Sequence, residues 1–354
     1  MVYVKVMKTL KLLELISWSE KNFSHLPWRK ERTLFGTLVS EIMLQQTTVG
    51  TVRNHFERFL GRFPDLKALA ESTEEELLVA WKGLGYYRRA RNLKRIAETL
   101  AKDYEGDFPG KEEVLMKIPG IGPYTAGALI AIGMNKRALA VDANLERVIA
   151  RLFQLKSPKG VKLQKEIQVL FKEKKIFSEI KSYRKLNEAL MDLGRTFCQA
   201  RKASCELCPL RMGCLSFQHG NPLNFPVVSK GEKKEVSHEL HLLRIMVVKD
   251  NKLLVYKKDS SEWLSGQYET PTFMISTTDK KLNQYPNLGD LNFKVVWSFK
   301  TGITKYKIQN DVVVLKEKDF KKISFSKNLE WRSLDSEESN FSTATLKALK
   351  QINT

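Results

Sequence analysis

The four cysteines of this 354-residue chain lie close together, with six, two and five residues between them, at Cys198, Cys205, Cys208 and Cys214. Chance would scatter them along the chain, and without a secretory signal we expect metal ligands rather than disulfides. A structural zinc site usually pairs two short Cys-x2-4-Cys arms, whereas here one tight pair is flanked by single cysteines. This spacing favours a 4Fe-4S cluster on one compact loop, with zinc as the alternative.

The composition is strongly basic, with 60 Lys and Arg against 40 Asp and Glu and a net charge of +20. A charge of this size predicts a polyanionic partner, either nucleic acid or an acidic membrane, over a merely soluble basic surface. Lys5, Lys8, Lys11 and Glu14 interrupt the first apolar stretch, which argues against a signal peptide or a membrane span. With no lipidation motif, nucleic acid is favoured and no membrane partner is expected. We expect a cytoplasmic, nucleoid-associated monomer.

The length of the chain allows two domains, each with its own core. Residues 1–225 have the periodicity of successive helices separated by Gly and Pro, and Ser72 with Glu75 is the predicted capping box of one of them. Residues 226–237 are charged and contain Pro and Gly, as a linker does. Residues 238–354 follow as a second domain.

The second domain has β-branched apolar runs that predict strands, followed by one helix. Residues 241–248 and 253–256 are separated by Lys-Asp-Asn-Lys, which predicts a hairpin between them. Further strands are expected at 293–299, 303–308 and 312–315, and a closing helix at 342–352. The whole chain is thus predicted to be an all-helical domain that carries the cysteines, followed by a smaller α+β domain.

Two glycines, Gly120 and Gly122, lie just before an apolar helix, in Ile-Pro-Gly-Ile-Gly-Pro-Tyr. This spacing lets the backbone turn tightly and point N–H groups outward at a helix N-terminus, where a phosphate can bind. Alone, the pattern is also typical of an ordinary helix–helix turn. In a basic chain with a cysteine cluster, a hairpin that binds the DNA backbone is the favoured interpretation.

Two carboxylates are candidates for catalysis. Asp142 precedes an apolar helix, where it is a good N-cap, and the helix dipole would also keep it ionised to stabilise a developing cation. Glu41 lies beside an apolar stripe, four residues before Gln45. A solvated Glu is the usual outcome there, but Gln45 and Gln46 are amides suited to reading base edges, so a site at the border of the core is the alternative.

These motifs occur in the order found in the helix-hairpin-helix DNA glycosylases. They are Ser-Glu-Ile-Met-Leu-Gln-Gln-Thr around Glu41, Gly-Leu-Gly-Tyr-Tyr at 83–87, the glycine hairpin, Asp142 and the cysteine loop. The chain resembles the adenine-specific family of that superfamily from about residue 26 to 214, and more faintly beyond. The resemblance implies an all-α helix-hairpin-helix glycosylase domain with a 4Fe-4S cluster loop, plus a C-terminal α+β MutT-like (Nudix-like) domain that recognises the opposite base.

The implied function is hydrolysis of the N-glycosidic bond of adenine mispaired with 8-oxoguanine or guanine in double-stranded DNA. Related lyases carry a lysine where this chain has Tyr124, and a tyrosine cannot form a Schiff base, so a monofunctional enzyme is expected. Glu41 would be the general acid and Asp142 the stabiliser of the sugar cation, oriented by Tyr124 and Asn144. The resemblance assigns contacts with DNA or the substrate base to Gln45, Gln46, Tyr86, Gly120, Gly122, Glu188 and Thr304.

The chain departs from the family pattern at two places. Ile303-Thr304-Lys305 stands where the family has Phe-Ser-His, which keeps a hydroxyl at Thr304, and Ala143 stands in place of a glycine. Two alternative functions remain, a T·G mismatch glycosylase of the same fold and a non-catalytic protein that binds damaged DNA. The residues beyond 238 and Glu188 argue against the first. The cysteine loop is expected to hold basic residues against phosphates, namely Arg195, Arg201, Lys202 and Arg211.

Overall fold

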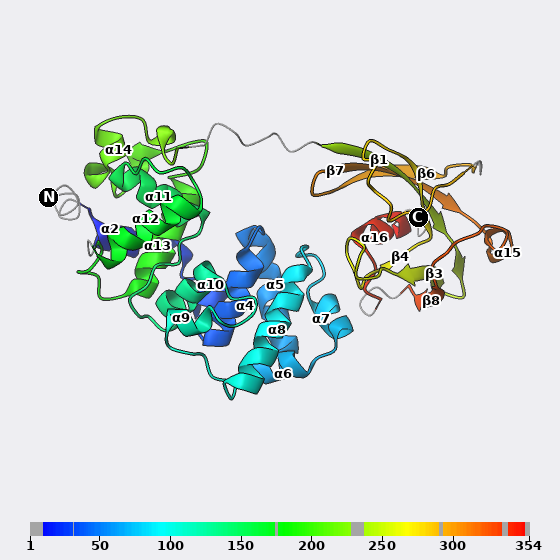
Figure 1. Cartoon of the computed structure of the whole chain (residues 1–354), viewed down its shortest axis with the longest axis horizontal. Helices are drawn as coiled ribbons and strands as arrows, with labels where there is room; N and C mark the ends of the chain where they lie inside the picture. Colours follow the sequence, from blue (N-terminus) through cyan, green and yellow to red (C-terminus); the bar gives the residue numbers. More distant parts are fainter. Residues whose placement is uncertain are drawn as a thin grey trace. The chain divides into compact units, whose positions relative to one another are not determined.

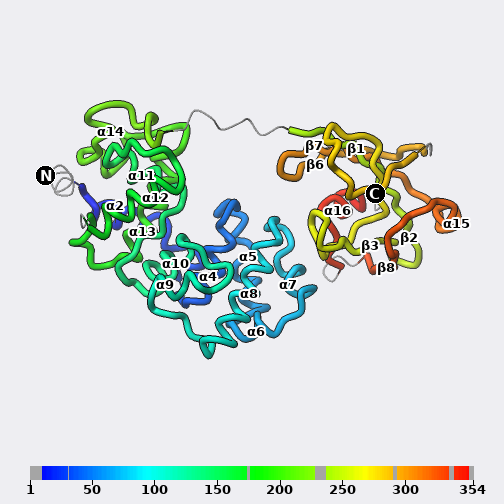
Figure 2. Tube along the Cα trace, viewed as in Figure 1, coloured from blue at the N-terminus to red at the C-terminus, as the bar shows by residue number. Residues whose placement is uncertain are grey.

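The computed structural model describes residues 10–30, 32–173, 176–227, 237–289, 293–334 and 339–350 (Figures 1 and 2). The chain groups into two compact units, Met1–Ser72 with Arg88–Glu232, and Thr73–Tyr87 with Lys233–Thr354. Most of the predicted linker, residues 228–236, lies outside the described residues. No helix in the described part of the chain combines the length and hydropathy that a membrane span requires.

The first unit is built from helices, as predicted (Figure 1). They are α2 (Leu12–Phe23), α3 (Pro27–Lys30), α4 (Leu34–Leu44), α5 (Val49–Arg62), α6 (Leu66–Glu71), α8 (Arg88–Asp103), α9 (Glu112–Leu115), α10 (Pro123–Ala128), the π-helical turn η1 (Leu129–Gly133), α11 (Ala143–Phe153), α12 (Val161–Lys172) and α13 (Tyr183–Thr196). Short 3-10 turns and α14 (Leu215–Gln218) complete it. Several helices begin at a residue whose side chain accepts a backbone N–H bond, among them Thr33, Thr48, Asp65 and Ser182.

Helix α7 (Glu74–Ala80), which groups with the second unit, does begin with a capping box. The predicted pair, Ser72 and Glu75, is wrong by one residue. Thr73 accepts from the backbone of Glu76, and the Glu76 carboxylate accepts from the backbone of Thr73. Ser72 instead donates to the carbonyl of Leu69 and belongs to the end of the preceding helix.

The helices of the first unit gather in two groups (Figures 1 and 2). Helix α2 packs on α13, so the described start of the chain lies beside a helix far along it, and α11, α12 and α14 join them. The other group contains α4, α5, α6, α8, α9 and α10, and η1 contacts both α4 and α13. Glu41 and Tyr124 therefore come from one group and Asp142 and Glu188 from the other.

Helix α4 is more deeply buried than its predicted apolar stripe implied. Every residue from Phe35 to Met43 is buried, and Leu38 and Val39 have no exposed surface. Burying side chains of this size contributes about 1.5–3 kcal/mol each, which offsets the desolvation of a single polar group on the same helix. Glu41 is the ionisable group among the buried polar residues of α4, which also include Thr37 and Ser40, and it lies inside the core rather than at its border.

The second unit contains two four-stranded sheets. The strands are β1 (His238–Met246), β2 (Val248–Lys249), β3 (Lys252–Lys257), β4 (Tyr268–Glu269), β5 (Thr272–Thr277), β6 (Trp297–Ile303), β7 (Tyr306–Val314) and β8 (Leu329–Ser333), with short helices α15 (Glu317–Phe320) and α16 (Thr343–Leu349). One sheet has the order β5-β1-β7-β6, and in the other β2-β3-β4 is extended by β8 on β3. The predicted α+β character is confirmed.

The predicted hairpin between 241–248 and 253–256 is only half right. Val248 and Lys249 form a separate strand that pairs with β3, whereas β1 leaves for the other sheet, antiparallel to β5 and parallel to β7. The predicted strand at 303–308 is wrong because β6 ends at Ile303 and β7 begins at Tyr306. Thr304, with φ of +48°, occupies the turn between them.

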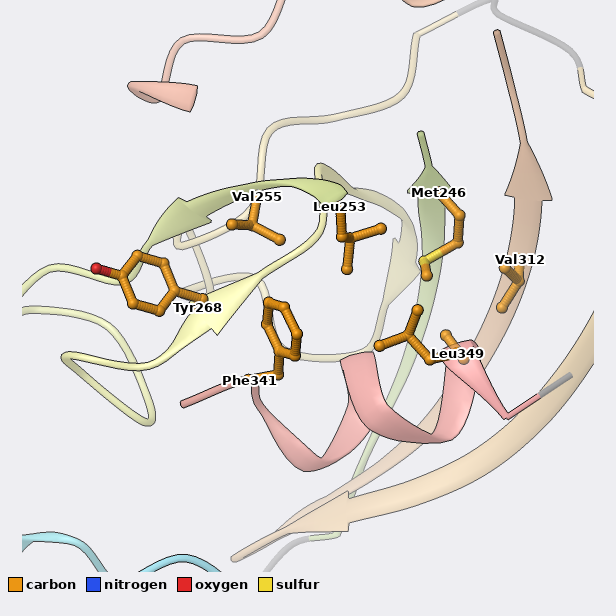
Figure 3. Packing of buried hydrophobic residues seen from close by; sticks show 8 residues of the cluster. Met246, Leu253, Val255, Tyr268, Val312, Phe341 and Leu349 are labelled. Atoms are coloured by element: carbon orange, nitrogen blue, oxygen red, sulfur yellow. The ribbon is translucent and has the colours of Figure 1, made fainter. Parts of the chain in front are cut away.

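Helix α16 begins at Ser342, as predicted, and residues 351–354 lie outside the described part of the chain. Its Leu349 belongs to a buried cluster that includes Met246 and Val312 from one sheet and Leu253 and Val255 from the other (Figure 3). One apolar core therefore joins the two sheets and the closing helix.

Candidate active site

Glu41 is a buried carboxyl group in the last turn of α4, with a residue exposure of 5%. Burial raises its pKa to about 7, from an ordinary value of 4.5, and the charges of Asp142 and Glu188 act in the same direction. The hydrogen bond from Tyr124 and the positive charge of Arg29 oppose this rise. A carboxyl group with a pKa near 7 can give up a proton at neutral pH, as a general acid must.

Tyr124 lies in the first turn of α10, directly after the glycine hairpin, and its hydroxyl donates a hydrogen bond to Oε2 of Glu41. Burial and the nearby carboxylates of Glu41 and Asp142 raise the pKa of Tyr124 well above 10. The phenol therefore keeps its proton and acts as a donor. The sequence predicted that Tyr124 orients Asp142, whereas the structure places its hydroxyl on Glu41.

Asp142 is the N-cap of α11, which confirms the structural half of its prediction. Its Oδ1 accepts from the backbone N–H groups of Asn144 (2.9 Å) and Leu145 (2.7 Å), and its Oδ2 accepts from the Asn144 amide (2.8 Å). Burial raises the pKa of Asp142, and these hydrogen bonds oppose the rise because they favour the ionised form. Ala143 is the first residue of α11 and does not have a positive φ. Its methyl group therefore causes no backbone strain of the kind that would require glycine.

Asn144 is itself held by Arg147, one turn further along α11. The guanidinium donates to Oδ1 of Asn144 (2.8 Å), to the carbonyl of Gly194 (2.8 Å) and to the carbonyl of Cys198 (2.7 Å). Arg147 thus connects the residue that orients Asp142 with the first cysteine of the loop. Sequence reasoning missed Arg147, which reads as an ordinary charged helix residue.

Glu188 lies on α13 with an exposure of 7%, and Arg32 binds it with both guanidinium nitrogens, at 2.5 and 3.1 Å. Arg29 is 3.6 Å from Glu188 and 2.8 Å from Asp192, and its buried Nε has no hydrogen-bond partner among the described residues. Sequence reasoning missed both arginines, because Arg-Lys-Glu-Arg after Trp28 resembles a solvated charge run. A contact between Glu188 and adenine stays a prediction.

The two hairpin glycines have different roles. Gly120 has φ of +102°, and a Cβ there would lie 2.8 Å from Nδ2 of Asn92, so both backbone and space require glycine. Gly122 is the N-cap of α10, and a Cβ there would meet nothing within 4 Å. The hairpin geometry agrees with the predicted DNA-backbone contact.

Gln45 and Gln46 follow α4, and Gln45 is its C-cap rather than a helical neighbour of Glu41, because the helix ends at Leu44. Gln46 is exposed with φ of +57°. In the second unit, Tyr86 is 54% exposed with φ of +48°, and Thr304 is exposed in the β6–β7 turn. Contacts of these four residues with DNA stay predictions.

The four cysteines line one pocket of the first unit, together with Arg151, Arg211 and apolar side chains. Burial and the neighbouring thiols raise the pKa of Cys208 to about 12 and that of Cys214 to about 11. Four sulfurs around a single pocket suit a four-thiolate cluster. Its iron ions would offset the negative charge of four neighbouring thiolates. As they stand, the described residues contain no group of three or more ligands placed to hold a metal ion.

The basic residues of the cysteine loop differ in their surroundings. Arg201 and Lys202 are exposed, as a phosphate-binding role requires. Arg195 instead donates to Asp192 and stacks on the ring of Phe23, and Arg211 pairs with Glu206. Arg201 and Lys202 are therefore the better candidates for phosphate contacts.

The chain is similar in sequence to known DNA repair proteins. The family model of the HhH-GPD superfamily base excision DNA repair proteins matches residues 39–173. The adenine DNA glycosylase of Buchnera aphidicola subsp. Schizaphis graminum is 30% identical over 291 residues, which cover 82% of this chain and 78% of that protein. The human adenine DNA glycosylase is 32% identical over 214 residues, covering 58% of this chain and 39% of that one. A solved thermostable thymine-DNA glycosylase is 26% identical, with a TM-score of 0.49 over 60% of this chain and 97% of that one.

The helical fold, the glycine hairpin and the carboxyl groups of buried Glu41 and half-buried Asp142 define a helix-hairpin-helix base excision DNA repair protein. It is a DNA glycosylase, an enzyme that acts on N-glycosyl bonds. More narrowly, the chain belongs to the adenine DNA glycosylase family.

Proposed function

We propose that this glycosylase hydrolyses the N-glycosidic bond of adenine that lies opposite 8-oxoguanine or guanine, and that it does not cut the DNA strand. The observation that carries the proposal is the buried Glu41, whose pKa is raised to about 7 beside an N-capping Asp142. Two carboxyl groups with separated roles, one protonated and one ionised, are what cleavage through an oxocarbenium-like sugar requires.

In the proposed reaction, Glu41 transfers its proton to N7 of an extruded adenine. The bond between C1′ and N9 then breaks, its electron pair leaves with the base, and the sugar becomes cationic. Asp142 accepts three hydrogen bonds that favour its ionised form, so it can stabilise this cation. The Glu41 carboxylate then takes a proton from the attacking water, which restores the acid and leaves an abasic sugar.

The absence of lyase activity is proposed from Tyr124. In lyase members of the superfamily a lysine at this position attacks the sugar, but here a phenol donates to Glu41 instead. Glu188 and the buried Arg29, whose Nε lies 3.6 Å from the Glu188 carboxylate, are the polar groups proposed to contact the edge of the purine.

We also propose that Cys198, Cys205, Cys208 and Cys214 hold a 4Fe-4S cluster. Hydrolysis needs no electron transfer, so the proposed contribution of the cluster is to fix the loop that carries Arg201 and Lys202. Broad visible absorbance with about four irons per chain would support this proposal. A colourless protein with one zinc would contradict it.

The sheet-rich part of the second unit is proposed to be a MutT-like domain that recognises the opposite base, and Thr304 is its candidate contact residue. The exposed position of Thr304 in a two-residue turn supports this role, since a hairpin tip can reach a ligand. We further propose that the enzyme acts as a monomer on nucleoid DNA.

The test is a panel of duplexes carrying A opposite 8-oxoguanine, A opposite G, A opposite C and T opposite G, each incubated with and without hot alkali. We expect adenine release that is fastest opposite 8-oxoguanine or G, with strand breaks only after alkali. Breaks without alkali would contradict the monofunctional proposal, and release of thymine alone would favour a T·G mismatch glycosylase. DNA binding without release of any base would favour a damage-binding protein.

A further inference from the structure

We propose that Arg89 is a positioning residue that locks the Gln45–Gln46 turn in the conformation needed to extrude adenine. The proposal rests on the proposed function and on the DNA contact that the sequence resemblance predicts for Gln45 and Gln46. Arg89 comes from α8, which is remote in sequence from the turn, and it is 8% exposed. Neither the sequence patterns nor the family match assigns it a role.

The Arg89 guanidinium closes the C-terminal end of α4. Its Nη1 donates to the carbonyls of Ile42 (2.9 Å) and Met43 (2.7 Å) and makes a short hydrogen bond to the carbonyl of Gln45. Its Nη2 donates to the hydroxyl of Thr47 at 2.9 Å. A helix C-terminus leaves its last carbonyls unpaired, and here one planar fork pairs several of them and the following loop.

The loop that Arg89 holds is a strained turn. The N–H of Thr47 donates to the carbonyl of Leu44 at 3.4 Å, Gln45 has φ of −60° and ψ of 116°, and Gln46 has φ of +57°. These values are typical of a type II turn, whose third residue is normally Gly or Asn. Gln46 has a Cβ in this position, so the turn costs about 1–2 kcal/mol of backbone strain. Strain of this kind persists where the surroundings over-determine it and often marks a functional position.

Electrostatics support the same role. The C-terminal end of α4 carries about half a negative charge, which would repel the phosphates of a bound duplex. The Arg89 guanidinium lies on these carbonyls and offsets that charge while the exposed Gln46 side chain stays outside. Without Arg89, the C-terminal end of α4 would repel the DNA phosphates. With Arg89 in place, this end of the helix can lie close to them.

The first test measures the turn in the DNA-free protein by amide hydrogen exchange over residues 44–48. We expect Arg89→Lys to increase exchange there roughly tenfold to hundredfold, because a lysine keeps the charge but loses the fork. Arg88→Lys, the same change at the exposed neighbouring residue, is the matched control and should leave this segment unchanged. In Arg89→Lys/Gln46→Gly the glycine removes the strain, so we expect much of the protection to return. Unchanged exchange in Arg89→Lys would overturn the proposal.

The second test measures single-turnover release of adenine from two substrates, a duplex with A opposite 8-oxoguanine and an oligonucleotide with the same adenine in an unpaired bulge. We expect Arg89→Lys to slow the duplex reaction roughly tenfold to hundredfold and the bulge reaction much less, since a bulged base needs little extrusion. A purely structural defect transmitted to Glu41 would slow both equally and shift the pH profile, and this outcome would overturn the proposal. If the wild-type enzyme releases no adenine, the proposed function fails instead, while the exchange test still reports on the turn.

Discussion

The hydroxyl of half-buried Tyr124 donates a hydrogen bond to Oε2 of buried Glu41. This bond favours the ionised carboxylate and limits the rise that burial causes, so that the pKa of Glu41 is about 7. The bond tunes the acid because, without it, Glu41 would hold its proton at still higher pH.

The first prediction concerns the pH dependence of excision. Release of adenine should fall as pH rises through about 7, because Glu41 must carry the proton that it transfers to N7 of adenine. Tyr124→Phe removes the hydrogen bond that lowers the pKa of Glu41. The pH at which the rate of adenine release falls, its alkaline limit, should therefore increase, even if the maximal rate falls. Single-turnover rates between pH 5 and 9 measure the limit. Tyr183→Phe, at a buried tyrosine on α13, is the control and should leave it in place.

The second prediction is that Glu41→Gln abolishes excision, retains DNA binding and stabilises the protein at neutral pH. The pKa of Glu41 is near 4.5 in the unfolded chain and about 7 in the folded protein. The free energy of unfolding therefore decreases as pH rises from 4.5 to 7, and the loss stays constant above pH 7. Gln should therefore raise the free energy of unfolding above pH 7 by about 1–3 kcal/mol, and by little below pH 4.5.

Urea unfolding at pH 8 and pH 4.5 measures this difference, and a duplex-binding assay checks the second half of the prediction. Glu146→Gln is an informative contrast. Glu146 is equally buried, but its oxygens accept from Gly160 (2.7 Å) and Gln164 (3.1 Å), so losing its charge should destabilise the protein. Equal effects of the two changes would contradict our account of Glu41.

The third prediction concerns Gly194 on α13. A Cβ at this position would lie 2.7 Å from Cβ and 3.3 Å from Cα of Asn144, so Gly194→Ala must displace the residue that orients Asp142. We expect a loss of about 1–3 kcal/mol of stability from this overpacking, and a lower kcat with little change in DNA affinity. Gly61→Ala, at a helical glycine with nothing within 4 Å, is the control and should be neutral or slightly stabilising.

The fourth prediction concerns acid unfolding of the second unit. Burial alone would raise the pKa of Glu269, but Lys258 and Arg244 outweigh it and hold the pKa at about 2. Because the folded value is depressed, the stabilisation is present above about pH 4.5 and is lost as pH falls toward 2. Glu269→Gln leaves two buried cations unpaired and should cost about 3–5 kcal/mol. Thermal unfolding followed by β-sheet circular dichroism measures this loss of stability. Glu317→Gln, which removes the surface ion pair with Lys249, is the control.

The sequence predicted the local structure around the candidate site because its residues lie in short motifs with strong local signals. Asp142 is the N-cap expected from its place before an apolar helix, and Tyr124 follows a hairpin that two glycines mark. Arg29, Arg32, Arg89 and Arg147 were missed for one physical reason. Each acts through contacts made across tens of residues, and no local pattern distinguishes such an arginine from a solvated one.

Strand existence was predictable, but strand pairing was not. The alternation around residue 250 indicates two strands and a turn, and Val248 does pair with Leu253. The nine residues of β1 nonetheless belong to another sheet, because pairing with β5 and β7 buries both faces of that strand. Long-range burial, which a hydropathy pattern does not specify, decided the topology.

The parallel pairing of β1 with β7 also has a kinetic consequence. His238 aligns with Tyr306 and Met246 with Val314, so the central pair of this sheet joins segments almost seventy residues apart. Closing so long a loop must precede the gain from the contacts it allows, which makes pairing of this kind slow. During synthesis β5 can pair with one edge of β1 first, but the other edge of β1 stays unpaired until β7 has been made. The sheet-rich unit is thus the part of this enzyme that most needs protection from aggregation while it folds.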